Sequence, residues 1–316
     1  MNSRRNFIKT TTAGIAGLSL TGKTVASHML KPVTKRPIHV FTKCLQFLGY
    51  DEIAEVLAEL GFDGADLTVR RGGQVLPENV EIDLPNAVKS LRNKGIDSQM
   101  IATDINDAED PLTKRVLKTM ADLGIRYYRM GYINFDEKKS IPQNLDDIRL
   151  TFEKLEKLNR EFGVTGNYQN HSGTRVGGPV WDLFYLLKDR DPESIGVQYD
   201  VRHATVEGGV SWPLGMKLLS SWIRTTDIKD FIWEKDETGK WRLINVPLGE
   251  GMVEFSKYFE MYKSYHLEAP VSIHYEYDLG GAEHGQVNPT MGREEIFLWL
   301  KKDLAFLRQK FEEYNL

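Results

Sequence analysis

The sequence predicts a single-domain (β/α)8 TIM barrel, and three observations lead to this prediction. Glycines after the apolar end of a helix recur at Gly61, Gly95, Gly124 and Gly163, at intervals of about 30 to 40 residues that fit one βα unit each. Apolar residues at helical spacing fill these intervals, as over residues 144–162. A short apolar run, typical of a buried strand, follows each glycine within a residue or two.

The predicted elements alternate along the whole barrel region. Strands are expected at residues 37–43, 63–69, 97–102, 126–131, 164–170, 196–201, 223–229 and 271–277. Helices are expected at residues 51–60, 83–94, 111–122, 144–162, 179–189, 213–220, 253–265 and 293–313. This alternation favours a closed parallel barrel. An open doubly wound sheet would need a glycine-rich phosphate turn after its first strand, and residues 42–45 read T-K-C-L.

The N-terminal segment differs from the rest of the chain. Residues 3–9 read S-R-R-N-F-I-K, and residues 1–26 contain four basic residues and no acidic one. This pattern resembles a twin-arginine export signal, so we expect residues 1–26 to be a signal peptide, residues 35–316 the barrel, and the protein periplasmic. The apolar stretch at residues 13–20 is too short for a permanent membrane anchor.

Charge argues against a nucleic-acid partner. The formal net charge is −4, and removing the four basic residues of the leader gives −4 − 4 = −8. An acidic surface does not suit binding to a phosphate backbone. The single cysteine, Cys44, cannot form an internal disulfide, and we expect it in the core. A homo-oligomer is compatible with the sequence.

Polar and titratable residues interrupt the strands near their C-terminal ends in the second half of the chain. They are Gln169, His171, Asp200, His203, Asp227, Lys229, His274 and Glu276. Strands buried on both faces should be nearly continuous apolar runs, and buried charges are costly without partners. The C-terminal ends of barrel strands carry the active site, so the pattern indicates an enzyme.

One insertion breaks the regular unit length. Residues 230–250 are too long for a simple βα loop and contain the hairpin-like turn E-T-G-K. An excursion after the seventh strand would overhang the mouth of the barrel. There Trp233 could stack on a ligand, whereas Trp241 would pack the hairpin; packing within the hairpin remains an alternative for Trp233 also.

Three short motifs on consecutive strands resemble those of the xylose isomerase-like barrel superfamily. This superfamily includes sugar phosphate isomerases and epimerases and the AP endonucleases of family 2. The motifs are D-x-x-H at Asp200 and His203, K-D at Lys229 and Asp230, and G-E-G at residues 249–251. The resemblance covers about residues 35–316.

The resemblance implies one divalent cation held by Glu, Asp, His and Glu from strands five to eight. Asp200 and Glu276 match this pattern, but Gln169 and Asp227 stand where the family has glutamate and histidine. The implied ligand set of Gln169, Asp200, Asp227 and Glu276 would suit Mg²⁺ or Mn²⁺. The alternative is a metal-free site in which Lys229, His171 and His203 supply the electrophile.

The resemblance also implies roles for individual residues. Glu276 is the expected general base, with His203 or His171 as its partner and Lys229 as a further catalytic group. The residues expected to contact the substrate are His203, Asn170, Trp233 and His274. Two alternatives remain open here: His171 could cap a helix, and Lys229 could do no more than pair with Asp227 or Glu276.

The leading hypothesis for function is a sugar isomerase or epimerase that removes a proton α to a carbonyl. Its substrate would be a free or keto-sugar, a small-molecule carbohydrate. The first alternative is a lyase or hydratase acting on a 3-keto-sugar or keto-glycoside, because Gln169 cannot serve as a second base. The second is a non-catalytic sugar-binding barrel. Endonuclease activity needs a metal cluster, which seven histidines and an acidic balance do not favour.

Overall fold

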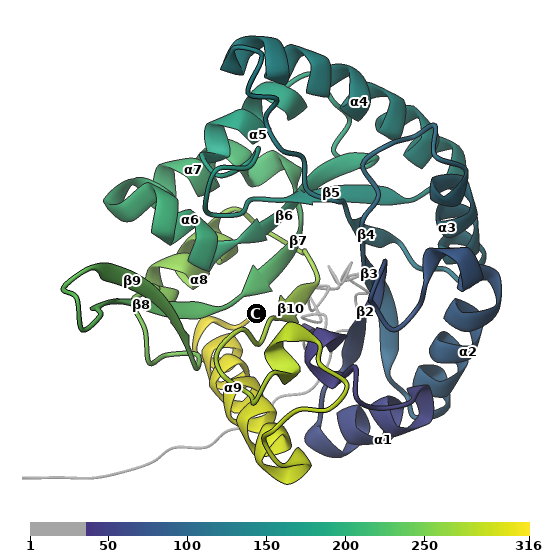
Figure 1. Cartoon of the computed structure of the whole chain (residues 1–316), viewed down its shortest axis with the longest axis vertical. Helices are drawn as coiled ribbons and strands as arrows, with labels where there is room; N and C mark the ends of the chain where they lie inside the picture. The colour runs from purple at the N-terminus through teal and green to yellow at the C-terminus, as the bar shows by residue number, and fades with distance from the viewer. Residues whose placement is uncertain (1–35) are drawn as a thin grey trace, which may run out of the picture. The chain divides into compact units, whose positions relative to one another are not determined.

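The computed structural model describes residues 36–316, which form one closed parallel barrel. The strand order is β1-β10-β7-β6-β5-β4-β3-β2, with parallel pairing throughout and helices around the outside (Figure 1). The predicted (β/α)8 barrel is confirmed. The predicted signal peptide at residues 1–26 lies outside the described residues. Within them, no helix has both the length and the apolarity needed to cross a membrane.

The barrel strands are short and buried. Their bounds are β1 Ile38–Phe41, β2 Gly64–Val69, β3 Asp97–Thr103, β4 Tyr127–Arg129, β5 Thr165–Gln169, β6 Ile195–Asp200, β7 Ile223–Ile228 and β10 Val271–Ile273. The prediction for the last strand, residues 271–277, is therefore too long. Its backbone leaves the ladder after Ile273, so His274 and Glu276 lie in the loop that follows. Lys229 likewise follows the last residue of β7.

The helices lie around the barrel. The α-helices are α1 Tyr50–Leu60, α2 Val80–Asn93, α3 Pro111–Asp122, α4 Ile141–Phe162, α5 Val180–Leu187, α6 Val201–Gly208, α7 Trp212–Leu219, α8 Phe255–Ser264 and α9 Arg293–Tyr314. The 3-10 helices are η1 Thr42–Leu45, η2 Pro77–Asn79, η3 Gly209–Ser211, η4 Ser220–Trp222 and η5 Ala282–His284. The predicted stripe in α4 is buried at Leu145, Ile148, Phe152 and Leu155.

Glycine caps explain the regular spacing of the units. Gly61 ends α1 with φ 88° and Gly163 ends α4 with φ 67°, both in the left-handed region that glycine adopts without strain. Each cap N–H bonds a carbonyl of the preceding turn, for example Gly61 N to Leu57 O at 3.1 Å. The next barrel strand begins within a few residues, so the connections at the N-terminal face are short.

One helix is absent from the prediction. Helix α6 begins directly after β6 because the side chain of Asp200 caps it, with Oδ1 accepting a hydrogen bond of 3.0 Å from the backbone N–H of His203. The D-x-x-H spacing is therefore a capping pattern, in addition to any chemistry at these two residues.

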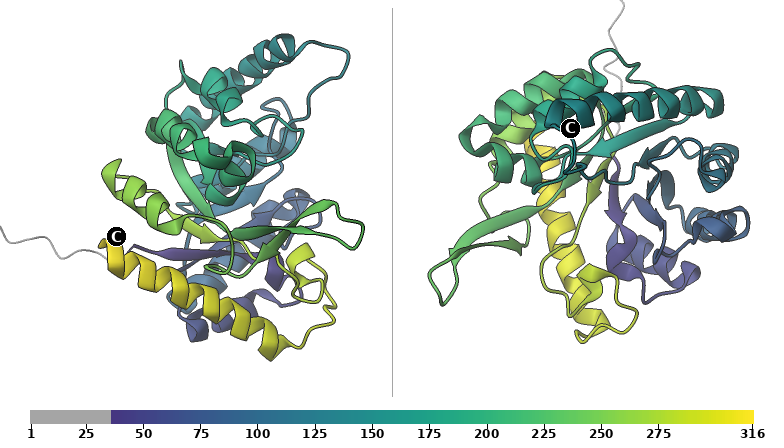
Figure 2. Two further views of the ribbon diagram at one scale, coloured as in Figure 1. Left: turned by 90° about the vertical axis from the view of Figure 1, so that its left-hand side faces the viewer. Right: turned by 45° about the horizontal axis from the view of Figure 1, so that its top comes forward.

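The predicted insertion forms an antiparallel hairpin outside the barrel sheet. Its strands are β8 Asp230–Lys235 and β9 Trp241–Val246, and they extend away from the barrel (Figure 2). Asp230 holds the base of this hairpin. Its carboxylate accepts bonds of 2.8–3.1 Å from the backbone N–H groups of Phe231, Gly249, Gly251 and Val253. A Cβ at Gly251 would lie 2.2 Å from Asp230 Oδ1, which explains why glycine stands there.

Candidate active site

Polar side chains from neighbouring strands meet at the C-terminal mouth of the barrel. Strands β5, β6, β7 and β10 are consecutive in the sheet, so the residues at their ends lie side by side. Asp200 and Asp227 are directly paired in the ladder between β6 and β7. Of the residues predicted for the site, Gln169, Asp200, Asp227, Lys229, His203, His274 and Glu276 belong to one connected network.

Gln169 links the two aspartates. Its Nε2 donates to Asp200 Oδ2 at 2.8 Å and to Asp227 Oδ2 at 2.7 Å. Its Oε1 accepts hydrogen bonds from the Tyr132 hydroxyl and from Arg129 Nη1. The amide thereby bridges two carboxylates that would otherwise repel each other, and both of its polar atoms are engaged.

Lys229 lies at the centre of the charged groups. Its Nζ is 2.9 Å from Asp200 Oδ2 and 3.2 Å from Glu276 Oε1. Burial alone would lower the pKa of Lys229, but the carboxylates of Asp200 and Glu276 outweigh burial and raise it, so the side chain is an ammonium. This double pairing offsets the cost of burying the charge.

Glu276 is the carboxylate that a ligand can reach. Its side chain is 24% exposed, whereas that of Asp200 is fully buried. Burial would raise the pKa of Glu276, but the ammonium groups of Lys229 and Lys43 hold it well below its usual range. Glu276 is therefore ionised near neutral pH and available to accept a proton.

The two histidines of the mouth lie close together, with their rings tilted by 34°. The ring centroids of His171 and His203 are 3.9 Å apart. Burial, followed by the charge of Lys229, lowers the pKa of both imidazoles, and that of His203 well below its usual value. His171 Nδ1 donates to the Ser172 carbonyl at 2.8 Å, which leaves its Nε2 as the free lone pair. His171 is therefore a second proton acceptor in the site.

His274 lies deeper, between two aspartates. Its Nε2 is 3.0 Å from Asp227 Oδ1 and 3.7 Å from Asp66 Oδ2, and its ring stacks on Phe41 at 4.3 Å. Burial favours a lower pKa for His274, but Asp227 raises it above the ordinary value. His274 is buried, as is the aspartate on each side.

The ligand set implied by the family resemblance is occupied by contacts with Lys229 and within the set itself. In the set of Gln169, Asp200, Asp227 and Glu276, the Lys229 ammonium lies against two of the carboxylates, and Gln169 turns its N–H groups toward two of them. This donor set, so arranged, does not fit a divalent cation, which would face an ammonium at contact distance.

A different trio could hold a metal ion. Ligand atoms of Asp66, Asp227 and His274 all lie within 4.8 Å of one another. Among residues 36–316, Asp66 Oδ1 is buried without a hydrogen-bond partner, whereas His274 Nε2 already lies 3.0 Å from Asp227 Oδ1. A buried oxygen without a partner is costly, and a cation bound at this trio would satisfy Asp66 Oδ1. Only Asp227 belongs to both sets, and the implied ligand set contained neither Asp66 nor His274.

Two predicted substrate contacts lie apart from the network. Asn170 is buried and uses both ends of its amide on the backbone of Asp200, at 2.9 Å and 2.8 Å, so it fastens β5 to β6. Trp233 is 41% exposed on the hairpin and packs edge-on against Phe231 at 6.4 Å.

The first half of the chain supplies residues that sequence reasoning missed. Arg129 ends β4, is buried, and lies over the rings of Phe41 and Tyr132 at 5.2 Å and 5.4 Å. Lys43 follows β1 at the mouth, and burial lowers its pKa. Their place at or just beyond a strand end is the sequence signal by which Arg129 and Lys43 could have been found.

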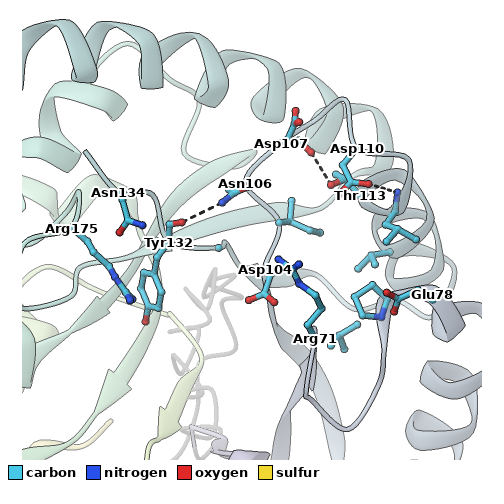
Figure 3. A pocket seen from close by; sticks show the side chains of 16 residues that line it. Arg71, Glu78, Asp104, Asn106, Asp107, Asp110, Thr113, Tyr132, Asn134 and Arg175 are labelled. Carbon is cyan, nitrogen blue, oxygen red and sulfur yellow. Dashed lines mark hydrogen bonds between the residues drawn. The ribbon is translucent and has the colours of Figure 1, made fainter. Parts of the chain in front are cut away.

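A cavity of about 490 Å³ adjoins the network (Figure 3). It opens among the loops after β2, β3, β4 and β5, and its polar lining includes Arg71, Asp104, Asn106, Tyr132, Asn134 and Arg175. Tyr132 connects the two regions, because its ring lines the cavity and its hydroxyl bonds Gln169. A polar cavity of this size can accept a small ligand.

The barrel resembles several solved structures at low sequence identity. An L-ribulose 3-epimerase is 13% identical with a TM-score of 0.67, the match covering 89% of this chain and 96% of that one. A probable 3-DHS dehydratase from Bacillus anthracis is 15% identical with a TM-score of 0.59, covering 86% and 98%. A xylose isomerase-like barrel protein from Mycobacterium smegmatis, in complex with magnesium, is 17% identical with a TM-score of 0.58, covering 86% and 99%.

Family membership follows from the sequence match. No curated protein sequence matches the chain. The structural matches, all below one fifth identity, establish the fold alone. The model of one family matches residues 54–309, which is most of the described barrel. The chain therefore belongs to the xylose isomerase-like TIM barrel family.

Proposed function

We propose that the chain is a sugar-converting enzyme of the epimerase and isomerase class that removes a proton α to a carbonyl. The observation that carries this proposal is the contact of 3.2 Å between Glu276 Oε1 and Lys229 Nζ at the mouth of the barrel. It supplies a carboxylate that can accept a proton beside a cation that can stabilise a developing enolate oxygen. The similarity to a sugar epimerase supports this assignment.

The proposed roles follow from exposure and charge. Glu276, the partly exposed carboxylate, is the general base, and His171 is the second candidate for that role. Lys229 and His203, whose Nζ and Nε2 are 3.0 Å apart, face the substrate oxygen. The carbohydrate would occupy the mouth and extend past Tyr132 into the adjoining cavity.

A divalent cation, Mg²⁺ or Mn²⁺, is proposed at Asp66, Asp227 and His274. Similarity to a magnesium-bound barrel supports a cation in this fold. When bound, the ion would supply a fixed positive charge below the mouth. Asp227, as a ligand of the ion, would hold Gln169 and through it Asp200 in place, while proton transfer stays with Glu276.

A second candidate function is a lyase or hydratase acting on a keto-sugar, and one specific observation favours it. An epimerase that works with two carboxylate bases needs one on each face of the carbon. At the end of β5 this chain has Gln169, and its amide is bonded to both aspartates. One-base elimination or hydration requires no second carboxylate, and a dehydratase is among the similar structures.

We also propose that the enzyme works in the periplasm. This rests on the S-R-R-N-F-I-K pattern at residues 3–9. In that compartment free or oxidised sugars are more available than phosphorylated ones.

The test of the function is product analysis by NMR in deuterated water, with a panel of ketoses and 3-keto-glucosides. Exchange of one carbon-bound hydrogen with inversion or carbonyl transfer would establish the epimerase or isomerase class. Loss or gain of water or of a glycosidic group would establish the lyase or hydratase class. Tight binding without exchange at any carbon would contradict both and favour a sugar-binding protein.

A further inference from the structure

Asn245 of β9 connects the hairpin to the proposed active site. Its Oδ1 accepts a hydrogen bond of 2.5 Å from Arg202 Nη2, and its Nδ2 donates to the backbone carbonyl of Glu276 at 3.1 Å. Asn245 therefore contacts the residue that precedes His203 and the backbone of the proposed base. None of the proposed catalytic roles involves the side chain of Asn245.

The hairpin also fixes Arg202 from a second direction. The Arg202 guanidinium lies over the ring of Phe231 at 5.7 Å, and Phe231 and Asn245 are directly opposite each other in the hairpin. Arg202 and Phe231 are both buried. Since Asp230 anchors the base of the hairpin through four backbone N–H groups, Arg202 is held against a rigid support.

His203 lies between two cations that compete for it. Its Nδ1 is 2.8 Å from Arg202 Nη1, and its Nε2 is 3.0 Å from Lys229 Nζ. Guanidinium and ammonium groups only donate hydrogen bonds, and a neutral imidazole offers one lone pair. Only one of the two cations can therefore donate to the ring, and the one that does so determines which ring nitrogen carries the proton.

Arg202 is the expected hydrogen-bond donor to the His203 ring, because Lys229 has other acceptors. Lys229 Nζ is within 3.2 Å of carboxylate oxygens of both Asp200 and Glu276. The alternative acceptor of Arg202 Nη1 is Ser172 Oγ, at the longer distance of 3.3 Å. With Nδ1 as the acceptor, the ring proton is on Nε2, which lies beside Lys229 Nζ and 3.6 Å from Asp200 Oδ2.

We propose that Asn245 is a positioning residue that sets the tautomer of His203. It holds the Arg202 guanidinium against Nδ1, so that His203 presents an Nε2–H donor to the substrate oxygen. The consequence for turnover rests on the proposed function; the tautomer itself is a property of the free protein.

Loss of Asn245 should release the ring into its other tautomer. Without the acceptor at 2.5 Å, Arg202 is no longer fixed against Nδ1. Nδ1 can then carry the proton and donate to Ser172 Oγ, 2.8 Å away, while Nε2 accepts from Lys229. A substrate oxygen would meet a ring nitrogen with no proton to donate.

The experiment is long-range ¹H–¹⁵N NMR on the full-length protein labelled with [¹⁵N]histidine, because the two ring nitrogens report the tautomer directly. His203→Gln assigns the signals. We expect the Nε2–H form in the parent protein and a shift toward the Nδ1–H form in Asn245→Ala. The matched control is Ile244→Ala, an exposed neighbour on the same strand, which should keep the parent pattern.

Asn245→Asp provides a second variant should the alanine change disturb folding. It keeps an acceptor for Arg202 but loses the donor to Glu276, so the Nε2–H form should persist. The proposal is overturned if the parent protein shows the Nδ1–H form, or if Asn245→Ala leaves the parent pattern unchanged.

Turnover separates this inference from the proposed function. On a substrate identified by the deuterium assay, kcat/KM should fall about 10- to 100-fold in Asn245→Ala, as for other partners that orient an imidazole. Asn245→Asp should recover most of it. A tautomer change in a protein that turns over no sugar would contradict the function while the positioning role holds. Turnover unaffected by a confirmed tautomer change would remove His203 from the reaction.

Discussion

The carboxylate of Asp303 on α9 accepts a hydrogen bond of 3.1 Å from the hydroxyl of Tyr277, the residue after the proposed base. Its other oxygen accepts from the backbone N–H of Leu248, which follows the hairpin, also at 3.1 Å. Burial raises the pKa of Asp303 from 3.8 to about 7. One buried acid thus connects the outer helix to two loops of the mouth.

Stability should therefore depend on pH through Asp303. The folded state binds the proton of this acid more tightly than the unfolded state does. Its contribution is full below pH 3.8 and is lost as pH rises toward about 7. In Asp303→Asn, which resembles the protonated acid, that loss should be absent. As pH rises from 3.8 to about 7, the Tm of the parent protein should therefore fall relative to that of Asp303→Asn.

The measurement is thermal unfolding at a series of pH values, with Asp122→Asn on the exposed side of α3 as the control for charge removal. The control should follow the parent protein. A constant difference in Tm between Asp303→Asn and the parent protein would show that Asp303 titrates normally.

Replacing Glu276 by glutamine should remove the proposed base while preserving its size. Positioned acid–base groups contribute about 10²–10⁴-fold, so turnover should fall by at least that lower bound while substrate binding persists. Solvent-deuterium exchange into the substrate is the measurement, and Glu283→Gln, a buried carboxylate of the same last loop, is the control. Exchange as fast as in the parent protein would transfer the role to His171.

Divalent cation binding should depend on Asp66, Asp227 and His274. We expect Asp66→Asn to weaken Mn²⁺ binding, measured by calorimetry or by the EPR signal of free Mn²⁺, because Asp66 supplies an orphaned oxygen. Glu276→Gln should leave binding close to that of the parent protein, because Glu276 is not in the trio. The reverse pattern would favour the ligand set implied by the family resemblance.

The leader should direct export. Changing both Arg4 and Arg5 to lysine should leave the precursor in the cytoplasm, while the barrel, purified from that strain, keeps its folded circular dichroism spectrum. Cell fractionation measures the outcome. Normal periplasmic accumulation of the double variant would rule out the twin-arginine assignment.

The fold could be predicted because its signals are local. Gly61 and Gly163 mark helix ends through their own backbone conformation, and the stripe of α4 follows from helical spacing alone. The early end of β10 could not be predicted, because Tyr275 and Tyr277 continue the alternating pattern after the backbone has left the ladder. Those two side chains are buried against α9 instead, where Tyr275 bonds the carbonyl of Leu300.

Site residues at strand ends could be predicted from the sequence. Hydrogen-bond partners from strands distant in the sequence could not. Asp200, Lys229 and Glu276 follow from the order of the strands. That Gln169 would point its nitrogen at two aspartates depends on Tyr132 and Arg129 occupying its oxygen, and these come from another strand. Asp66 is likewise brought to His274 only by closure of the barrel.

Asp200 serves two purposes with one side chain: one oxygen caps helix α6 and the other pairs with Lys229. An N-cap is worth about 1 kcal/mol, so substitutions that abolish the cap reduce stability as well as chemistry. Substitution of Asp200 is therefore less readily tolerated as the family acquires new reactions. The side chains at 169 and 227 bond other side chains rather than helix backbone, so selection can exchange them at lower cost. Those are the two positions at which this chain departs from the family pattern, so diversification of the mouth should have proceeded there first.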